Sequence, residues 1–313
     1  MWLYSFQGDV IAETIRCYSK DAPHYNSLVG AMVIAAVLFL LQHYVDRLLH
    51  GRQIVYVLCY GPSMICLALL GIITSHSVAS DEYGVGELLG LLAVVAIWLL
   101  LVLLARPTPK ASPRHVFFTR TMWVNLLVMA VMIIGVVYFS NTKATVCYRA
   151  TIENCIAKGD IDKALCVGIE SMETDADLTR ARVKALSQRR LLGERLFHYP
   201  VDCKGSDILS AGNTADHRLC ALLVDRKLDA FANEITHYYN VNDSTHLPRH
   251  YREALILYGR QKSNPALVYR HPVTEVDYKD MLALEQMYNN PNERHLRVML
   301  RYHGSYWYYY KWR

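Results

Sequence analysis

Long apolar runs alternate with short polar stretches through the first 139 residues. Four of these runs approach 20 residues, at about 27–49, 54–73, 88–105 and 121–139. A helix needs about 20 apolar residues, at about 1.5 Å of rise each, to cross the ~30 Å hydrocarbon layer of a bilayer. Core helices of soluble proteins also contain apolar runs, but four in succession at this length favour a membrane. The pattern predicts an N-terminal segment, 1–26, and a transmembrane domain of four helices, 27–139.

Hydrophobic positions in the second half, 140–313, recur at helical spacing. No stretch alternates apolar and polar residues for long enough to predict a strand. The helices expected from caps, turn residues and prolines are 148–171 with a break at 158–160, 176–197, 215–240 with a division near 225–227, 247–261, 274–288 and 292–302. We therefore predict an all-α chain in which four transmembrane helices precede a soluble domain of α-helical repeats. Stacks of this kind present concave surfaces to peptides and proteins.

The segment YRATIENCIAKGDIDKALCVGIES (148–171) resembles a tetratricopeptide helix pair. Tyr148 stands at the first large aromatic position of that repeat, Gly159 at its turn, and Ala164 and Ser171 at small contact positions. Two positions depart from the pattern, Ile152 where the repeat is usually small and Ala176 where it often has proline. The resemblance covers about 30 residues, without a clean second copy at the repeat's spacing. It implies a tetratricopeptide-like C-terminal domain.

Two phrases, LPRHYREALILYGRQ (247–261) and SYWYYY (305–310), resemble an uncharacterised multi-pass membrane family of anaerobic gut bacteria. In that family, membrane helices precede an exported helical-repeat region. The resemblance implies the bacterial inner membrane, with the C-terminal domain in the periplasm. It implies no activity.

Charge is distributed very unevenly between the two halves. Residues 1–139 carry eight Lys or Arg and seven Asp or Glu, whereas 140–313 carry 25 and 21. The net charge is +5, but the basic residues do not form a dense cluster of the kind that binds phosphates. We therefore expect no nucleic-acid partner.

The placement of Lys and Arg in the short loops predicts the orientation. Loop 46–53 holds two basic residues and loop 106–120 holds four, while loop 74–87 holds none and carries three acidic residues. Because cytoplasmic loops retain Lys and Arg, loops 46–53 and 106–120 are expected in the cytoplasm. Residues 140–313 and the N-terminus then lie on the opposite side. The opening MWLYSF is either part of an exported tail or the stub of a further helix.

Asp9 and Glu13 are the only weak candidates for catalytic residues. They lie one helical turn apart in the external N-terminal segment, just before a membrane helix. Membrane enzymes that act on lipid-linked sugars place acidic residues in such a position. The simpler interpretation is a solvated helix face that carries Asp9, Glu13 and Arg16, and we favour it.

Other candidate chemistry is sparse. Gly61-Pro62-Ser63 should kink the second span. His246 and His250 are four residues apart, but Pro248 between them is expected to start a helix and separate the rings, so no metal site is predicted. Among the eight cysteines no CxxC occurs, and Cys155 and Cys166 could form a disulfide across the first helical turn or remain thiols. No motif for a cofactor is present.

The chain ends on GSYWYYYKWR, 304–313, its most aromatic stretch. Tyr and Trp favour the boundary between water and bilayer, where Lys and Arg reach lipid headgroups. The alternative is a cap that closes the end of the helical stack, with membrane contact as an added role. The residues expected to serve as this interface or cap are Trp307, Tyr310, Lys311, Trp312 and Arg313.

These observations favour a non-enzymatic integral inner-membrane protein whose periplasmic helical repeats bind or scaffold a protein partner. The expected partners are the lipid bilayer and a periplasmic or membrane protein. The alternative is a fragment or relative of a membrane enzyme that acts on lipid-linked sugars or envelope polymers, with Asp9 and Glu13 as its acids.

Overall fold

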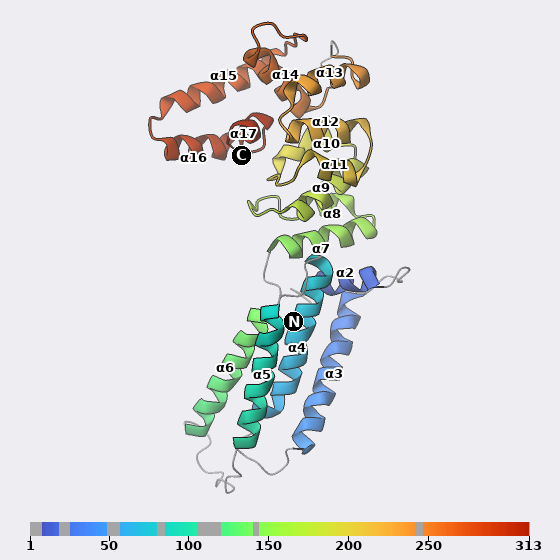
Figure 1. The fold of residues 1–313 in the computed structure, drawn as a ribbon, viewed down its shortest axis with the longest axis vertical. Coiled ribbons are helices and arrows are strands. Elements are labelled where there is room, and N and C mark those ends of the chain that lie inside the picture. Colours follow the sequence, from blue (N-terminus) through green and yellow to red (C-terminus); the bar gives the residue numbers. More distant parts are fainter. Residues whose placement is uncertain are drawn as a thin grey trace. The chain divides into compact units, whose positions relative to one another are not determined.

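The computed structural model describes residues 8–18, 26–48, 57–79, 85–104, 120–139, 144–241 and 247–312. Every regular element among these residues is a helix, so the predicted all-α class is confirmed for the described part of the chain. The chain divides into two compact units, Met1–Ala150 and Thr151–Arg313, which are described separately here. Figure 1 shows the helices of each unit.

Unit 1 is a helical bundle arranged around α4. Its elements are α2 (Gly8–Tyr18), α3 (Ser27–Leu48), the 3₁₀-helix η2 (Val57–Tyr60), α4 (Gly61–Ala79), α5 (Val85–Leu104), α6 (Arg120–Phe139) and the first half of α7 (Ala144–Ala157). Helix α4 packs against α2, α3, α5 and α6. The unit therefore has a central helix with the other long helices packed against it. Figure 1 shows these long helices running side by side.

Many large apolar side chains of unit 1 are exposed on the outside of its helices. Helix α3 has no buried residue at all, and Met32, Phe39 and Leu40 are each 65% exposed. Within the described residues, two helical stretches are long and apolar enough to cross a membrane, Ser27–Leu48 and Val57–Thr74. The apolar stretches of α5 and α6, Leu89–Leu100 and Met122–Tyr138, are shorter.

At the break predicted for Gly61–Ser63, the chain changes from the 3₁₀-helix η2 to the α-helix α4, which begins at Gly61, and a side chain from α5 packs there. Pro62 has no N–H, so the carbonyl of Leu58 four residues earlier loses its helical donor. The indole Nε1 of Trp98 donates to that carbonyl at 3.0 Å. Gly61 makes the approach possible, because a Cβ there would lie 2.0 Å from the indole nitrogen. The carbonyl freed by Pro62 is therefore satisfied by a hydrogen bond between η2 and α5.

Unit 2 is a chain of short helices, most of which pack against their neighbours in sequence. They are α8 (Ile161–Cys166), α9 (Ala176–Gln188), α10 (Leu192–Arg195), the 3₁₀-helix η4 (Leu196–His198), α11 (Gly205–Ala211), α12 (Ala215–Val224), α13 (Leu228–Tyr238), α14 (Arg249–Gln261), α15 (Pro272–Met287), α16 (Pro291–Tyr302) and α17 (Tyr306–Trp312). Some helices also pack against elements further along the chain: α9 packs against α11 and α10 against α12. Helix α14 is contacted both by α10, which precedes it in the sequence, and by α17, which follows it. Helix α14 therefore lies at the centre of the unit's core.

Several predicted boundaries in unit 2 are confirmed. Helix α7 ends at Ala157, Gly159 takes the left-handed conformation at φ 79°, and Asp160 occupies the N-cap position of α8. Its carboxylate makes no capping bond and instead pairs with Lys163. Helices α12 and α13 divide at Arg226, at φ 58°.

Two predicted helices are shorter than expected. The segment 176–197 is broken after Gln188, where Arg190 adopts φ 56° and the chain turns before α10. Helix α8 ends at Cys166, because Gly168 adopts φ 62° instead of lying on a helical face. The short helix α11 was not predicted.

Candidate functional site

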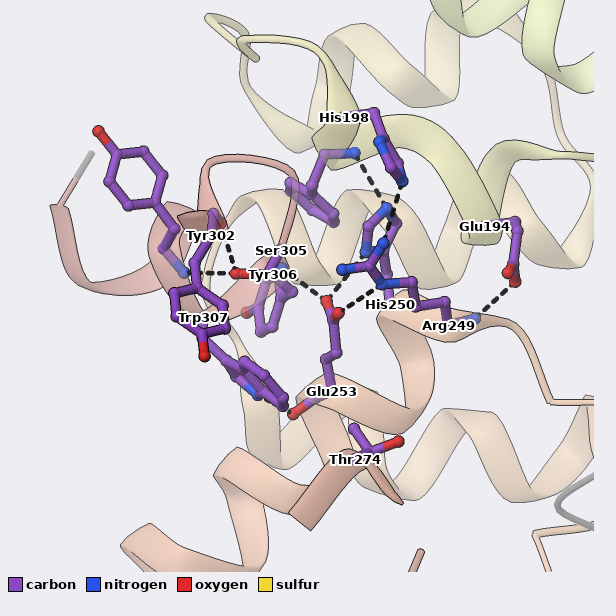
Figure 2. Close-up of polar contacts among 12 residues, drawn as sticks. Glu194, His198, Arg249, His250, Glu253, Thr274, Tyr302, Ser305, Tyr306 and Trp307 are labelled. Atoms are coloured by element: carbon purple, nitrogen blue, oxygen red, sulfur yellow. Dashed lines mark hydrogen bonds and ion pairs between the residues drawn. The ribbon is translucent and has the colours of Figure 1, made fainter. Parts of the chain in front are cut away.

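The most elaborate side-chain cluster in unit 2 centres on the carboxylate of Glu253. It projects from α14 and is 2% exposed. Its Oε1 accepts a hydrogen bond from Nε of Arg249 at 2.8 Å. Its Oε2 accepts from Nδ1 of His250 at 3.0 Å and from the backbone N–H of Tyr306 at 2.7 Å. Figure 2 shows the carboxylate between α14 and the start of α17.

The ring of His250 is held by two fixed contacts. It is fully buried, and its Nε2 accepts a hydrogen bond from the backbone N–H of Phe197 at 3.3 Å. An Nε2 that accepts carries no proton, so the neutral ring bears its proton on Nδ1 and donates it to Glu253. The imidazole therefore connects η4 to α14.

Arg249 joins the cluster to the segment around α10. Its guanidinium Nη1 lies 3.3 Å from Nε2 of His198, and its backbone N–H donates to Oε2 of Glu194 at 2.6 Å. Because Arg249 is in the first turn of α14, Glu194 satisfies one of the donors that a helix N-terminus leaves unpaired. Figure 2 shows these contacts on the side of Glu253 away from α17.

Two pKa values in the cluster are displaced downward. Burial opposes ionisation of Glu253, but the hydrogen bond from His250, the charge of Arg249 and the hydrogen bond from the Tyr306 N–H outweigh it and hold the pKa of the carboxyl below its usual value. For His198, burial together with the positive charge of its neighbours lowers the pKa to about 4. The folded cluster therefore holds an anionic Glu253 beside a neutral His198.

We expect unit 2 to lose stability in acid in two successive steps. An unfolded His198 takes up a proton near pH 6.5, whereas the folded ring resists protonation down to about 4. The contribution of the neutral His198 to the stability of unit 2 should therefore be full above pH 6.5. It should decline as the pH falls from 6.5 toward 4. Glu253 adds a second loss below about pH 4.5, where the unfolded carboxyl protonates first. Urea denaturation at a series of pH values between 7 and 3.5 measures the free energy of unfolding. The variant His198→Asn should make this free energy nearly independent of pH between 6.5 and 4.

The C-terminal helix α17 is anchored directly on this cluster. Tyr306, Trp307 and Tyr308 are 0%, 3% and 9% exposed. Ser305 caps the helix, since its Oγ accepts from the Tyr308 N–H at 3.3 Å. The indole of Trp307 donates to the carbonyl of Glu253 at 2.8 Å. The first turn of the aromatic tail is thus part of the core of unit 2.

Tyrosine hydroxyls of α17 also reach the end of α12. Tyr306 donates to the carbonyl of Leu223 at 3.2 Å, and Tyr309 donates to that of Val224 at 3.0 Å. These carbonyls belong to the last turn of α12, where the helical hydrogen-bond pattern ends. The Leu223 carbonyl also accepts from the backbone N–H of Arg226 at 3.1 Å. Arg226, beyond that helix, stacks over the ring of Tyr309 at 5.5 Å. The tail therefore closes helix ends as well as covering apolar surface.

A groove of about 380 Å³ lies beside the tail, between α14, α15 and α17. It is lined by Leu257, Gln261, Tyr278, Met281, Leu282, Trp307, Tyr310 and Lys311. Apolar and aromatic groups thus form most of its wall, and Gln261 and Lys311 contribute the polar groups. Lys311 also pairs with Glu285 of α15. A groove with this lining can take an apolar side chain and hold polar groups at its rim.

The Glu253 cluster itself has no catalytic geometry. Both carboxylate oxygens, both ring nitrogens of His250 and the Arg249 Nε are engaged in hydrogen bonds within the protein. With His250 and Glu253 at 0% and 2% exposure, a substrate cannot contact them. The cluster holds elements together, and the groove beside it is the candidate binding site.

The residues of the predicted tail site lie in different environments. Trp307 is buried and lines the groove; Tyr310 is half-buried and its hydroxyl donates to Gln261 at 3.4 Å. Lys311 is exposed, and Trp312 stacks on His295 with ring centroids 4.9 Å apart. Arg313 lies outside the described residues.

The two acidic candidates Asp9 and Glu13 both lie on α2. The interpretation of a solvated face is wrong for Glu13, which is 6% exposed, because α2 packs against α3 and α4. Asp9 lies near Cys147 of α7: burial, and then the charge of Asp9, raise the pKa of that thiol. The structure describes no side chain for Arg16, nor residues 1–7. The predicted residues of the aromatic tail belong to the other unit.

Of the paired histidines and cysteines, the structure describes His250, Cys155 and Cys166. His246 lies outside the described residues, and His250 is a fully buried core residue. Among the described residues, no group of three or more His, Cys, Asp or Glu side chains could hold a metal ion. Cys155 and Cys166 are not joined by a disulfide.

A second buried network was also invisible in the sequence. Oδ1 of Asp216 accepts hydrogen bonds from the hydroxyls of Tyr239 at 2.6 Å and Tyr251 at 2.9 Å. The Tyr251 ring passes over Gly193, where a Cβ would lie 2.6 Å from it. The sequence signal for these networks is a charged residue or a glycine on an otherwise apolar helical face. Such residues are Glu253, Asp216 and Gly193.

Comparisons with known proteins leave the chemistry open. No curated protein and no solved structure matches the chain. Residues 212–313 match a family model described as a family of unknown function (DUF6057). The matched segment includes α12 to α17, and therefore the groove, Glu253 and the aromatic tail. In this C-terminal part the chain is similar to an uncharacterised family.

Proposed function

We propose that the chain is a multi-pass membrane protein, with four helices in the bacterial inner membrane, whose periplasmic helical unit binds a protein partner. The groove between α14, α15 and α17 carries the proposal. It is concave, mostly apolar and aromatic, and bordered by polar groups, as sites for peptide segments are. Its wall is built on the buried Glu253 cluster, so the groove is largely preformed.

The membrane part of the proposal rests on unit 1. Large apolar side chains cover the outside of α3, and exposed apolar residues also occur along α5 and α6, for example Leu92 at 59% and Leu126 at 58%. A surface of this size would drive association in water. Lys and Arg in loops 46–53 and 106–120 favour the cytoplasm for those loops, and hence export of unit 2.

The short helices of unit 2 support a stack of tetratricopeptide-like character. Sequential packing of neighbours from α11 to α14 is the arrangement that builds a concave surface in repeat proteins. The tail supports a closing role, because an array of repeats needs a cap with a polar outer face. We propose membrane contact by Lys311, Trp312 and Arg313 as an added role of this cap.

Site-specific photocrosslinking in the full-length membrane protein tests partner binding. A photoreactive amino acid at Gln261 or at Leu282, both in the groove, should yield one reproducible crosslinked protein. The matched control is Glu170, an exposed residue that does not line the groove. Leu282→Arg should remove the crosslink from position 261. Equal crosslinking at 170, or none in the groove, contradicts the proposal.

A further inference from the structure

Unit 1 contains a cavity with an unusually uniform lining. It has a volume of about 350 Å³ and lies between α4, α5 and α6. Its wall is formed by apolar residues that include Met64, Ala68, Val94, Leu127 and Met132. The indole N–H of Trp98, which also lines it, is already bonded to the carbonyl of Leu58. The wall thus offers an occupant hydrophobic contact and no polar partner.

Glycines shape this cavity at two points. Gly61 admits the indole of Trp98, which forms part of the wall. On α6, Gly135 also lines the cavity, and no atom lies within 4 Å of the position its Cβ would occupy. Gly135 therefore faces open space instead of a close neighbour. A side chain at this position would enter the cavity without displacing another helix.

The cavity opens onto the outer surface of the bundle. Ile97, Leu127 and Val131 line it and are nevertheless 56%, 63% and 60% exposed. The medium that covers the outside of α5 and α6 is therefore continuous with the cavity. Water is a poor occupant, because apolar cavities without polar partners stay dry. A peptide backbone would leave its N–H and C=O groups without partners at this wall.

We propose that this cavity holds one acyl chain of a membrane phospholipid. The inference rests on the proposed membrane location of unit 1 and adds a defined lipid site to it. The acyl chain satisfies the three observations together: an apolar wall, no available polar partner, and a lateral opening to the surface that would face lipid. The chain enters between α5 and α6, beside Leu127 and Val131, and ends against Met64 and the Trp98 ring of the wall.

The test uses the full-length protein in vesicles that contain a phospholipid with a diazirine in its acyl chain. Photolabelling mapped by mass spectrometry should concentrate on Leu127–Met132 and on Met64, and should saturate as probe is added. Gly135→Phe places a ring in the open space and should reduce that labelling about tenfold, equivalent to one decade of affinity. The matched control, Val137→Phe, adds the same ring two residues away at a position 45% exposed and outside the cavity wall.

Labelling of α3 distinguishes a failure of the proposed membrane location from a failure of the proposed lipid site. Phe39 and Leu40 report whether unit 1 lies in the bilayer at all. If they are labelled and the cavity residues are labelled no more strongly, or equally in Gly135→Phe, the lipid site is overturned while the membrane location stands. If α3 is not labelled, the membrane location fails and the lipid site with it. The variant Gly135→Leu repeats the test with a smaller side chain. In a separate competition, a free fatty acid that removes all labelling of the cavity by the phospholipid probe would overturn the assignment to a phospholipid.

Discussion

Replacing Glu253 with alanine should lower the free energy of unfolding of unit 2 by about 3–5 kcal/mol. The substitution removes the one acceptor shared by Arg249, His250 and the Tyr306 N–H. His250 and the Tyr306 backbone would then be buried without their partner, which costs about 1–3 kcal/mol for each such group. The loss should therefore exceed that of a typical core substitution.

Cys220 provides a local probe for this measurement. Its thiol is fully buried, and burial raises its pKa, so it reacts only when the core opens. In a chain whose only cysteine is Cys220, Glu253→Ala should accelerate alkylation roughly 10²- to 10³-fold, at about tenfold for each 1.4 kcal/mol. Glu170→Ala, at an exposed position, is the control and should change the rate little. A rate for Glu253→Ala close to that of Glu170→Ala would refute the structural role of the cluster.

The second large effect is expected from Trp307→Ala. The indole is 3% exposed, contacts the ring of Tyr278 at 5.1 Å between centroids, and donates to the Glu253 carbonyl. Removing a buried tryptophan costs about 3–5 kcal/mol through lost burial and the cavity left behind. Unit 2 should therefore unfold at a markedly lower urea concentration.

A milder variant separates packing from the hydrogen bond. Trp307→Phe keeps most of the apolar volume and loses the donor to Glu253, so we expect a smaller loss of about 1–2 kcal/mol. Urea titrations of both variants in detergent measure the difference. Should Trp307→Ala unfold at the same urea concentration as the parent protein, the tail is not part of the core of unit 2.

Most helices of the chain could be predicted from local features of the sequence. Apolar runs predicted helices at the positions of α3 to α6, and Pro272 and Pro291 mark helix starts that a sequence can show directly. The break at Arg190 was missed because arginine carries no preference for φ 56°, unlike the glycine at 159. Local chemistry thus predicts elements well where Gly or Pro sets the backbone.

The site depends on contacts between distant residues, and no local pattern encodes them. Glu253 and Tyr306 are 53 positions apart, as are Phe197 and His250. The aromatic tail stood out in the sequence, and its aromatic and basic residues were consistent with a cap or with lipid contact. Only the three-dimensional structure shows that Tyr306 is buried together with Trp307. Side chains on both faces of the first turn of α17 are therefore buried in the core of unit 2.

The most direct test of the proposed architecture is the side of the membrane on which unit 2 lies. Two reporters are fused to the C-terminus after Arg313, one that fluoresces only in the cytosol and one enzyme that is active only after export. With four membrane crossings and cytoplasmic loops at 46–53 and 106–120, we expect a dark cell and an active exported enzyme. A bright cell with an inactive enzyme would contradict the four-helix topology and the periplasmic location of the groove.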